Sequence, residues 1–135
     1  MNWSFLSKWE PQMLSVLRIA SAFLFMAHGT QKLFGFPAGP QRPNRPPLVS
    51  TMGFGGLLEF VGGLLLLFGL FTRPVAFVLS GLMAVAYFGW HASGGFWPIL
   101  NRGELAALYS FVFLYFVFAG GGPWSVDYFL RGRKS

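Results

Sequence analysis

Apolar residues gather in four long runs along the chain, separated by short stretches rich in glycine, proline and polar residues. The runs cover approximately residues 14–36, 53–71, 74–91 and 103–120. A helix that crosses a membrane needs about 17–25 mostly apolar residues, and all four runs fit that length. None of them shows the strict apolar–polar alternation that is typical of strands in a membrane barrel. The pattern therefore predicts an all-α integral membrane four-helix bundle, a single domain over residues 1–135.

The segments between the runs contain residues that end helices. Residues 35–49 hold five prolines, which exclude a continuous helix because proline lacks the backbone N–H and fixes φ. Pro74 is suited to the first turn of the third helix. Residues 91–103 are expected to form a loop, and the glycine-rich residues 120–125 end the fourth run. We therefore expect four separate helices joined by one tight turn and two longer loops.

Composition changes the picture from a soluble domain to a membrane protein. Hydrophobic residues make up 54% of the 135 residues, charged residues only 10%, and phenylalanine occurs 17 times. Soluble domains usually carry about 25% charged residues, and short chains bury the smallest fraction of their surface. The remaining apolar surface needs lipid, so we expect the bilayer to be the principal partner.

The net charge of +6 does not predict nucleic acid as a partner. The basic residues are scattered at the ends of the apolar runs, whereas a nucleic-acid-binding protein needs a basic face. Basic residues and tryptophans in such places are typical of membrane interfaces. The sequence contains no cysteine, which excludes disulfides, thiol chemistry and thiolate metal sites within this chain.

Basic residues also suggest an orientation in the membrane. Four spans place both termini on one side, and the N-terminal residues lack the order of a signal peptide, so the first run is expected to stay in the mature protein. Six basic residues against four favour cytoplasmic termini. The six on the terminal side are Lys8, Arg18, Arg73, Arg131, Arg133 and Lys134, and the four on the other side are Lys32, Arg42, Arg45 and Arg102.

Polar residues from four separate segments fall at similar depth in the half of the membrane away from the termini. His28 and Lys32 are four residues apart and share a helix face, and a rise of about 1.5 Å per residue places Glu59 at matching depth. An ionised group at mid-membrane costs roughly 2.5–3.5 kcal/mol on insertion scales, which pairing of Glu59 with Lys32 or His28 would offset. The complete set is His28, Lys32, Glu59, His91, Asn101 and Glu104.

Structural interpretations stand beside the functional one. Lys32 could extend to the headgroups with no chemical role, and His28 could be a hydrogen-bonded packing residue. Glu59 and Lys32 could form a purely structural clamp, while His91 and Glu104, taken singly, fit the membrane interface. Arg18 is expected to extend toward the water on the terminal side.

Four stretches also occur in an order and spacing known from one family. They are AHGTQKLFG at 27–35, GGLLEFVGGLLLLFGLFTRPVA at 55–76, NRGELAALY at 101–109 and GGGPWSVD at 120–127. Over roughly residues 14–129 the chain resembles the DoxX family of small bacterial four-helix membrane proteins. The residues that carry the resemblance are His28, Gly29, Lys32, Glu59, Asn101, Gly103, Glu104, Gly120 to Gly122, Ser125 and Asp127. The long, proline-rich first loop is the departure from the family pattern.

The resemblance implies a multi-pass protein of the bacterial inner membrane. Some members are subunits of an archaeal thiosulfate:quinone oxidoreductase, and others resemble membrane partners of thiol and superoxide defence proteins. We therefore predict an accessory subunit of a membrane redox system, with a quinone as cofactor, a partner subunit and a possible homo-oligomer. The predicted catalytic cluster is His28, Lys32, Glu59 and Glu104, and the predicted cofactor-binding residues are His28, Glu59, His91 and Asn101, with no metal site.

Three other functions compete with this one. A noncatalytic scaffold or assembly partner for soluble redox or stress proteins would use the polar cluster only as a clamp. A proton or solute conductor is disfavoured because the half of the bundle near the termini offers no continuous polar path. A bis-histidine haem held by His28 and His91 is disfavoured by a difference in depth of about 10 Å.

Overall fold

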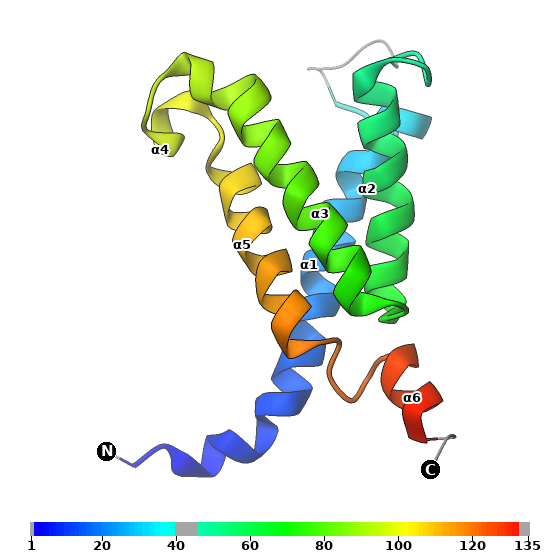
Figure 1. Cartoon of the computed structure of the whole chain (residues 1–135), viewed down its shortest axis with the longest axis vertical. Helices are drawn as coiled ribbons and strands as arrows, with labels where there is room; N and C mark the ends of the chain where they lie inside the picture. The colour runs from blue at the N-terminus through cyan, green and yellow to red at the C-terminus, as the bar shows by residue number, and fades with distance from the viewer. Residues whose placement is uncertain (1, 40–45, 133–135) are drawn as a thin grey trace.

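The computed structural model describes residues 2–39 and 46–132, and within these residues the predicted all-α fold is confirmed (Figure 1). Arg42, Arg45, Arg133 and Lys134, which entered the orientation argument, lie outside the described residues. The elements are the 3-10 helix η1 (Ser4–Trp9), α1 (Glu10–Phe34), α2 (Thr51–Phe68), α3 (Thr72–Ala86), the π-helical turn η2 (Tyr87–His91), the 3-10 turn η3 (Ala92–Gly94), α4 (Pro98–Asn101), α5 (Glu104–Ala119) and α6 (Val126–Gly132).

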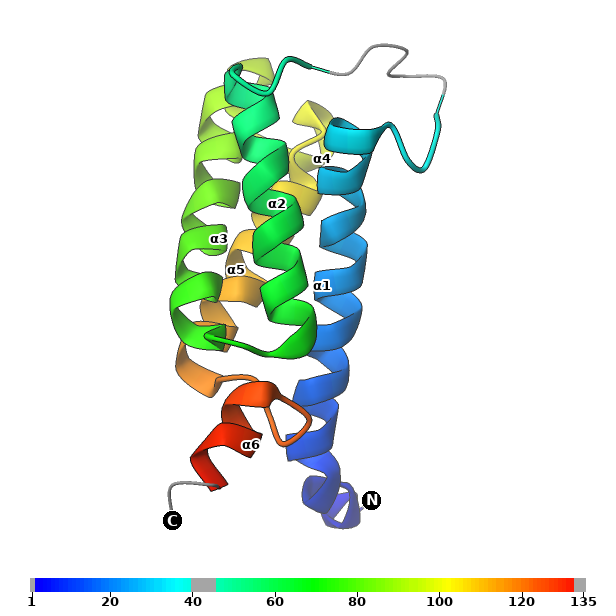
Figure 2. The same ribbon diagram turned by 90° about the vertical axis from the view of Figure 1, so that its right-hand side faces the viewer.

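The bundle consists of two antiparallel helix pairs. Helix α1 packs along α2, α3 packs along α5, and α2 and α3 join the pairs. The pairs lie close together where α5 ends and spread apart toward the opposite end (Figure 1). Both η1 and α6 lie at the end where the pairs converge, which we call the terminal end (Figures 1 and 2). The opposite end, which carries η3 and α4, is called the loop end.

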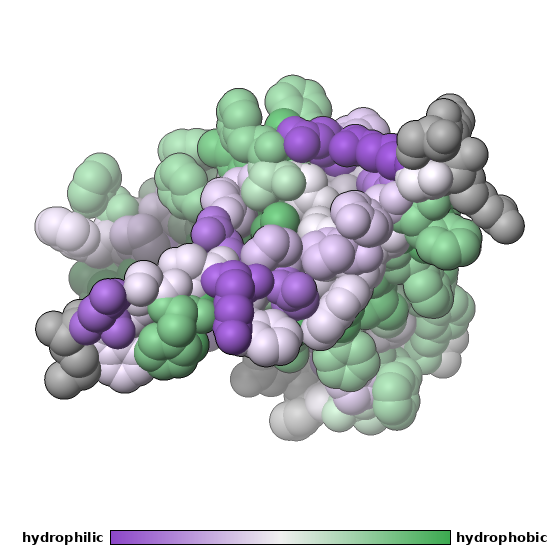
Figure 3. Space-filling view, turned by 90° about the horizontal axis from the view of Figure 1, so that it is seen from below, coloured by the Kyte–Doolittle hydropathy of each residue, from purple (hydrophilic) through white to green (hydrophobic). Residues whose placement is uncertain are grey.

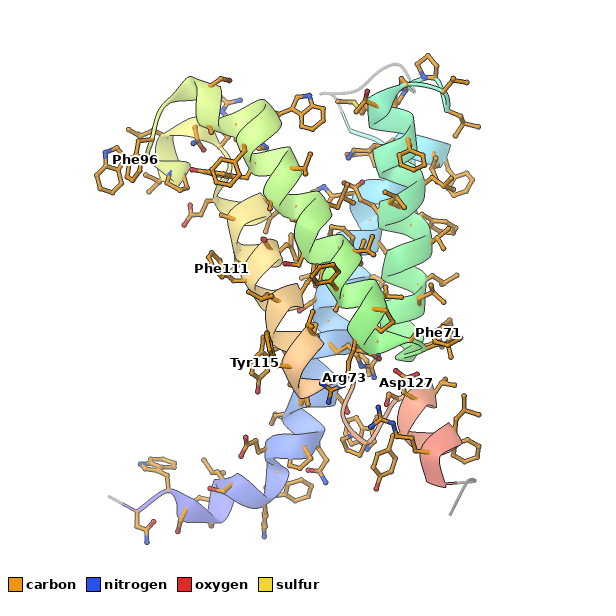
Figure 4. The ribbon with its side chains drawn as sticks, in the orientation of Figure 1. Phe71, Arg73, Phe96, Phe111, Tyr115 and Asp127 are labelled. Carbon is orange, nitrogen blue, oxygen red and sulfur yellow. The ribbon has the colours of Figure 1, made fainter. Side chains whose placement is uncertain are left out.

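Within residues 2–39 and 46–132, three helical segments are long and apolar enough to cross a membrane, namely Ser4–Phe34, Thr51–Phe68 and Thr72–Gly94. Helix α5 is equally apolar but has 16 residues, a length of about 24 Å, so a fourth span remains a prediction. Phe111 and Tyr115 point outward from α5 (Figure 4) and are 71% and 52% exposed. Aromatic side chains on the outer face of a membrane bundle contact lipid.

Local sequence signals set the ends of the helices. Gly35 and Gly69 follow α1 and α2 in the left-handed conformation, with φ of 68° and 70°, which glycine adopts without steric cost. The Ser50 hydroxyl accepts a hydrogen bond from the Gly53 amide at 3.1 Å and caps α2. The Asp127 carboxylate accepts hydrogen bonds from the amides of Phe71 and Thr72 at 2.8 and 2.7 Å, so α6 supplies the cap of α3.

Aromatic residues of the core join the two pairs, and serines join the helices of one pair. Phe25 of α1 packs edge-on against Phe113 of α5, with ring centroids 4.8 Å apart, and both side chains are buried. Between α3 and α5, the Ser80 hydroxyl donates a hydrogen bond to the Ser110 carbonyl at 2.8 Å, and the Ser110 hydroxyl donates one to the Ser80 carbonyl at 3.0 Å. These contacts fix the helices that form the walls of the site described below.

Candidate functional site

A cavity of about 580 Å³ lies between the two helix pairs. The residues that line it lie in the half of the bundle toward the loop end. The helix pairs have spread apart in that half (Figure 1). Helices α1, α2, α3 and α5, the turn η2 and the segment before α5 all contribute to its walls. The residues that line it are Phe25, His28, Gln31, Lys32, Gly39, Glu59, Met83, Ala86, His91, Arg102, Leu105, Ala106 and Tyr109.

The strongest polar contact in the cavity joins α1 to α2. Lys32 Nζ lies 2.7 Å from Glu59 Oε1, and the side chains are 16% and 6% exposed. The second carboxylate oxygen, Glu59 Oε2, is buried and has no hydrogen-bond partner among the described residues. The pairing of Glu59 with a basic residue of the first helix is therefore formed, and the partner is Lys32. One oxygen of the carboxylate is left for another donor.

Small residues allow α1 and α2 to approach closely at this ion pair. A Cβ atom on Gly29 would lie 2.5 Å from the Phe60 nitrogen, in the backbone of α2. A Cβ atom on Gly56 would lie 2.8 Å from Lys32 Cβ. Neither position can hold a larger residue without displacing a helix. The two glycines thus bring the backbones close enough for Lys32 to reach Glu59.

The other predicted site residues of α1 and η2 also reach the cavity. The His28 ring stands edge-on to the Tyr109 ring at a centroid distance of 6.4 Å, and His28 is exposed although it lies within a spanning helix. His91 lines the cavity from η2, and its Nδ1 is 3.2 Å from the Asn101 carbonyl oxygen. The cavity therefore brings together His28, Lys32, Glu59 and His91.

Asn101 and Glu104 do not line this cavity. The Asn101 amide donates to the Gly95 carbonyl at 2.9 Å and to the Tyr87 hydroxyl at 3.2 Å, while its oxygen accepts from the Gly103 amide at 2.8 Å. Asn101 therefore holds the loop together and acts on the cavity only through His91. Glu104 is exposed and lines a neighbouring depression, which shares Arg102 and Leu105 with the cavity. The predicted role of Glu104 as a second acid has no geometric support here.

The charges in the cavity do not cancel. Lys32 and Arg102 are cationic and Glu59 is anionic, so two positive charges against one negative leave a net charge of +1 when His28 and His91 are neutral. Phe25 of α1, Met83 of α3 and Leu105 of α5 supply apolar surface to the same cavity. Such a cavity suits a ligand that has a flat apolar body and electron-rich oxygens at its edge.

Arg18 is the polar residue whose role the sequence analysis misjudged. It does not extend to water, because its side chain is fully buried and donates hydrogen bonds to four carbonyl oxygens. These acceptors belong to Leu66, Leu67, Gly121 and Trp124, at distances of 2.5 to 2.8 Å. The carbonyls are available because α2 ends there and the glycine-rich segment after α5 is not helical. Burial of Arg18 therefore satisfies the backbone at the terminal end.

A signal for this role was present in the spacing of α1. Arg18 lies on the same helix face as Ser15, Ala22, Phe25 and Gly29, all of which are buried. A basic residue that falls on the buried face of a helix cannot extend outward to lipid headgroups. The spacing of three or four residues between Arg18 and its small neighbours on α1 would have identified Arg18 as a residue of the buried face.

No group of three or more His, Asp or Glu side chains that could hold a metal ion occurs within residues 2–39 and 46–132. The cavity instead offers one ion pair, two imidazoles and the Tyr109 phenol. These groups can hold protons and donate or accept hydrogen bonds. They can therefore bind and protonate a small polar group, while redox equivalents would have to come from elsewhere.

Comparison with known proteins relates the chain to membrane proteins. The family model described as DoxX matches residues 13–92. A protein of Haemophilus influenzae named "Uncharacterized protein" is 46% identical over 125 residues, which cover 90% of this chain and 93% of that relative. An uncharacterized membrane protein of Mycobacterium tuberculosis is 31% identical and covers 93% of this chain and 85% of its own length. The inner membrane protein YqjF of Escherichia coli is 31% identical and covers 95% and 99%. No solved structure matches the chain.

Proposed function

The chain belongs to the DoxX family, and on that premise we propose that it is a quinone-binding accessory subunit of a membrane redox system. The family match, the named membrane relatives and the apolar helices establish a multi-pass membrane protein. The proposal adds a ligand and a role to that statement. The observation that carries it is the cavity between the helix pairs, which is lined by the Lys32–Glu59 ion pair and by aromatic rings from α1 and α5.

The dimensions and lining of the cavity suit a quinone head group. Ligand pockets usually enclose about 300–1,000 Å³ and combine apolar walls with a few polar groups, and this cavity encloses about 580 Å³. Phe25 and Tyr109 supply aromatic surface against which a flat ring can pack. We propose that the cavity opens to the outside beside His28, which lines it and is exposed. A lipid-soluble ligand could enter there from the bilayer.

Quinone chemistry also needs proton carriers close to the ring oxygens. Reduction of a quinone to a quinol adds two electrons and two protons, one proton at each carbonyl oxygen. A general acid must lie within hydrogen-bond reach of the oxygen that it protonates. His28, His91 and Glu59 line the cavity and are the groups proposed to hold these protons, while Lys32 positions the Glu59 carboxylate. The electrons come from a partner subunit or from a soluble donor.

The direct test is the lipid content of the purified protein. The protein is expressed in its membrane, purified in mild detergent and extracted with organic solvent, and the quinone per protein is measured by chromatography. The wild type should retain quinone well above the amount carried by detergent alone. Glu59→Gln, which replaces the charged cavity wall, should lower the retained amount several-fold. Glu104→Gln is the matched control, because this glutamate lies outside the cavity, and it should retain the wild-type amount.

A scaffold without a ligand is the competing function, and the 2.7 Å contact between Lys32 and Glu59 supports it equally well as a clamp between α1 and α2. The two functions differ in the behaviour of a folded variant. If Glu59→Gln folds but loses the quinone that the wild type retains, the redox proposal is supported. If the wild type holds no quinone and Glu59→Gln fails to fold, the ion pair is a structural clamp and the redox proposal fails. Circular dichroism and gel filtration on the same sample establish whether the variant is folded.

A further inference from the structure

We propose that the terminal end of the bundle binds one anionic phospholipid, with its phosphate at Arg73 and Arg131 and an acyl chain along the surface between α2 and α3. This site shares no lining residue with the cavity between the helix pairs, and it does not depend on the proposed function. Two adjoining hollows carry the inference. One contains charged residues and the other is entirely apolar.

The charged hollow, which we call the basic pocket, encloses about 260 Å³ where the start of α3 meets α6. It is lined by residues 71–74 and by Asp127, Leu130 and Arg131 of α6. Figure 4 shows Arg73 and Asp127 beside each other at this end of the bundle. Two arginines against one aspartate leave the basic pocket with a net charge of +1, which favours an anion.

The arginines of the basic pocket remain available to a ligand. Arg73 Nη1 donates hydrogen bonds to the carbonyl oxygens of Val117 and Phe118 at 2.8 and 2.6 Å, and a guanidinium carries three further N–H groups. Arg73 and Arg131 are both exposed. Because the planar guanidinium matches the geometry of phosphate oxygens, a phosphate group is the anion that this pair fits best.

Asp127 does not compete with a ligand for these arginines by direct hydrogen bonding. Its two carboxylate oxygens accept hydrogen bonds from the amides of Phe71 and Thr72, at 2.8 and 2.7 Å. The carboxylate is therefore held against the start of α3. It moderates the positive charge of the basic pocket without occupying it.

The second hollow, which we call the apolar groove, encloses about 330 Å³ between α2 and α3. It is lined only by apolar residues and glycine, drawn from residues 58–65 and 71–79. Val61 and Val78 are 45% and 52% exposed, so the apolar groove opens on the outside of the bundle. Gly62 keeps it shallowly recessed, because a Cβ atom there would lie 2.7 Å from Leu79 Cδ2.

The two hollows adjoin at the level where a phospholipid changes from polar to apolar. Phe71 and Pro74 line both of them. Because α2 ends and α3 begins at this level, and both belong to segments that can cross a membrane, the basic pocket lies among the headgroups. Leu58 lies about 15 Å along α2 from its end at Phe68, and one leaflet of the hydrocarbon core is about 15 Å thick. The apolar groove therefore accompanies an acyl chain through one leaflet.

The test uses the full chain, purified and delipidated in mild detergent, with phosphatidylglycerol, phosphatidylcholine and inorganic phosphate as probes. The two lipids share acyl chains and a phosphate, but phosphatidylcholine also carries a cation. Native mass spectrometry measures the fraction of protein that carries one lipid during a titration. We expect phosphatidylglycerol to bind about tenfold more tightly, because the two arginines repel the choline cation. Inorganic phosphate at the same concentration should not displace it, since phosphate cannot use the apolar groove.

Two variants with matched controls locate the bound lipid. Arg131→Gln removes a charge from the basic pocket and should lower the affinity for phosphatidylglycerol about fivefold. Lys8→Gln removes an exposed charge of η1, outside the basic pocket, and should leave it unchanged. Val78→Phe fills the apolar groove and should weaken both lipids several-fold. Val85→Phe adds the same ring at an exposed position of α3 outside the apolar groove and should weaken neither.

Each outcome supports or overturns the lipid site. A preference for phosphatidylglycerol that is reduced by Arg131→Gln and not by Lys8→Gln supports it. Equal binding of the two lipids, or equal effects of these two variants, overturns the basic pocket as the headgroup site. Displacement by inorganic phosphate, or equal effects of Val78→Phe and Val85→Phe, overturns the apolar groove as the place of an acyl chain. None of these results changes the test of the proposed function, which measures retained quinone.

Discussion

Arg18 Nε donates a hydrogen bond to the carbonyl oxygen of Gly121 at 2.8 Å, across 103 positions of the chain. The same guanidinium bonds to carbonyls at the end of α2 and to Trp124. One side chain of α1 therefore ties α2 and the segment between α5 and α6 to the first helix. Arg18, together with Ser15 and Asp127, fastens the terminal end of the bundle. Hydrophilic residues gather across the middle of that face (Figure 3).

Replacing Arg18 should destabilise the protein strongly. Arg18→Met removes four hydrogen bonds to buried or half-buried carbonyls, and each carbonyl left without a donor costs about 1–3 kcal/mol. We expect a loss of about 3 kcal/mol or more in the free energy of unfolding, measured by denaturant titration in mild detergent. Arg73→Met is the control, because Arg73 also bonds to two carbonyls but is exposed. A loss as small as that of the control would contradict a central role for Arg18.

The ion pair between Lys32 and Glu59 should show strong coupling in a double-mutant cycle. Lys32→Met leaves a buried carboxylate unpaired, and loss of one partner of a buried pair costs about 3–5 kcal/mol. Lys32→Met combined with Glu59→Leu removes both charges and should recover most of that loss. Unfolding free energies of the wild type, the two single variants and the double variant give the coupling. Additive losses would mean that the 2.7 Å contact contributes little to stability.

Close packing of α1 on α2 should make Gly29 intolerant of any side chain. In Gly29→Ala the new Cβ would lie 2.5 Å from the backbone nitrogen of Phe60, so the helices must separate and Lys32 must withdraw from Glu59. We expect a lower melting temperature together with loss of retained quinone. Gly55→Ala is the matched control, because no atom lies within 4 Å of its added Cβ. It should leave stability unchanged or raise it by up to about 1 kcal/mol, since alanine favours helix over glycine.

Acid should weaken the docking of α6 through Asp127. Burial raises the pKa of the Asp127 carboxyl. Hydrogen bonds from Thr72 and from the Phe71 amide, together with the charge of Arg131, lower this pKa by more than burial raises it, so the net shift is downward from 3.8. A pKa that is lower in the folded state stabilises the protein above the unfolded value, and the contribution is lost as pH falls through the folded pKa. The stabilisation is therefore present at neutral pH and disappears in strong acid.

The measurement is a series of melting temperatures in detergent from pH 7 to strongly acidic buffer. The wild type should lose stability as the pH falls below the ordinary pKa of an aspartic acid, which is about 3.9. Asp127→Asn, which cannot ionise, should be less stable at pH 7 and should lose the part of the pH dependence that Asp127 contributes. Parallel curves for the two proteins would show that the cap of α3 does not depend on the charge.

Hydrophobic patterning was sufficient to predict the helical class and the depth at which Lys32 meets Glu59, because a membrane leaves a buried acid few alternatives to a basic partner. It did not reveal the short helices η1, α4 and α6. Helix α6 is held by a contact distant in the chain, that of Asp127 with Thr72. It also placed Arg18 at the water interface, since depth alone was considered and the buried face of α1 was not. Glu104 and Asn101 were assigned to the polar cluster by depth alone. The face of α5 on which Glu104 lies and the conformation of the loop around Asn101 place both residues outside the cavity lining.

The helix pairs converge at the terminal end and spread apart at the loop end, so the bundle resembles a lever with its fulcrum at the terminal end (Figure 1). Arg18 fixes the point about which the two helix pairs can turn, and the walls that carry His28 and His91 stand far from that point. A small rotation at the fulcrum therefore produces a much larger displacement where those walls face each other.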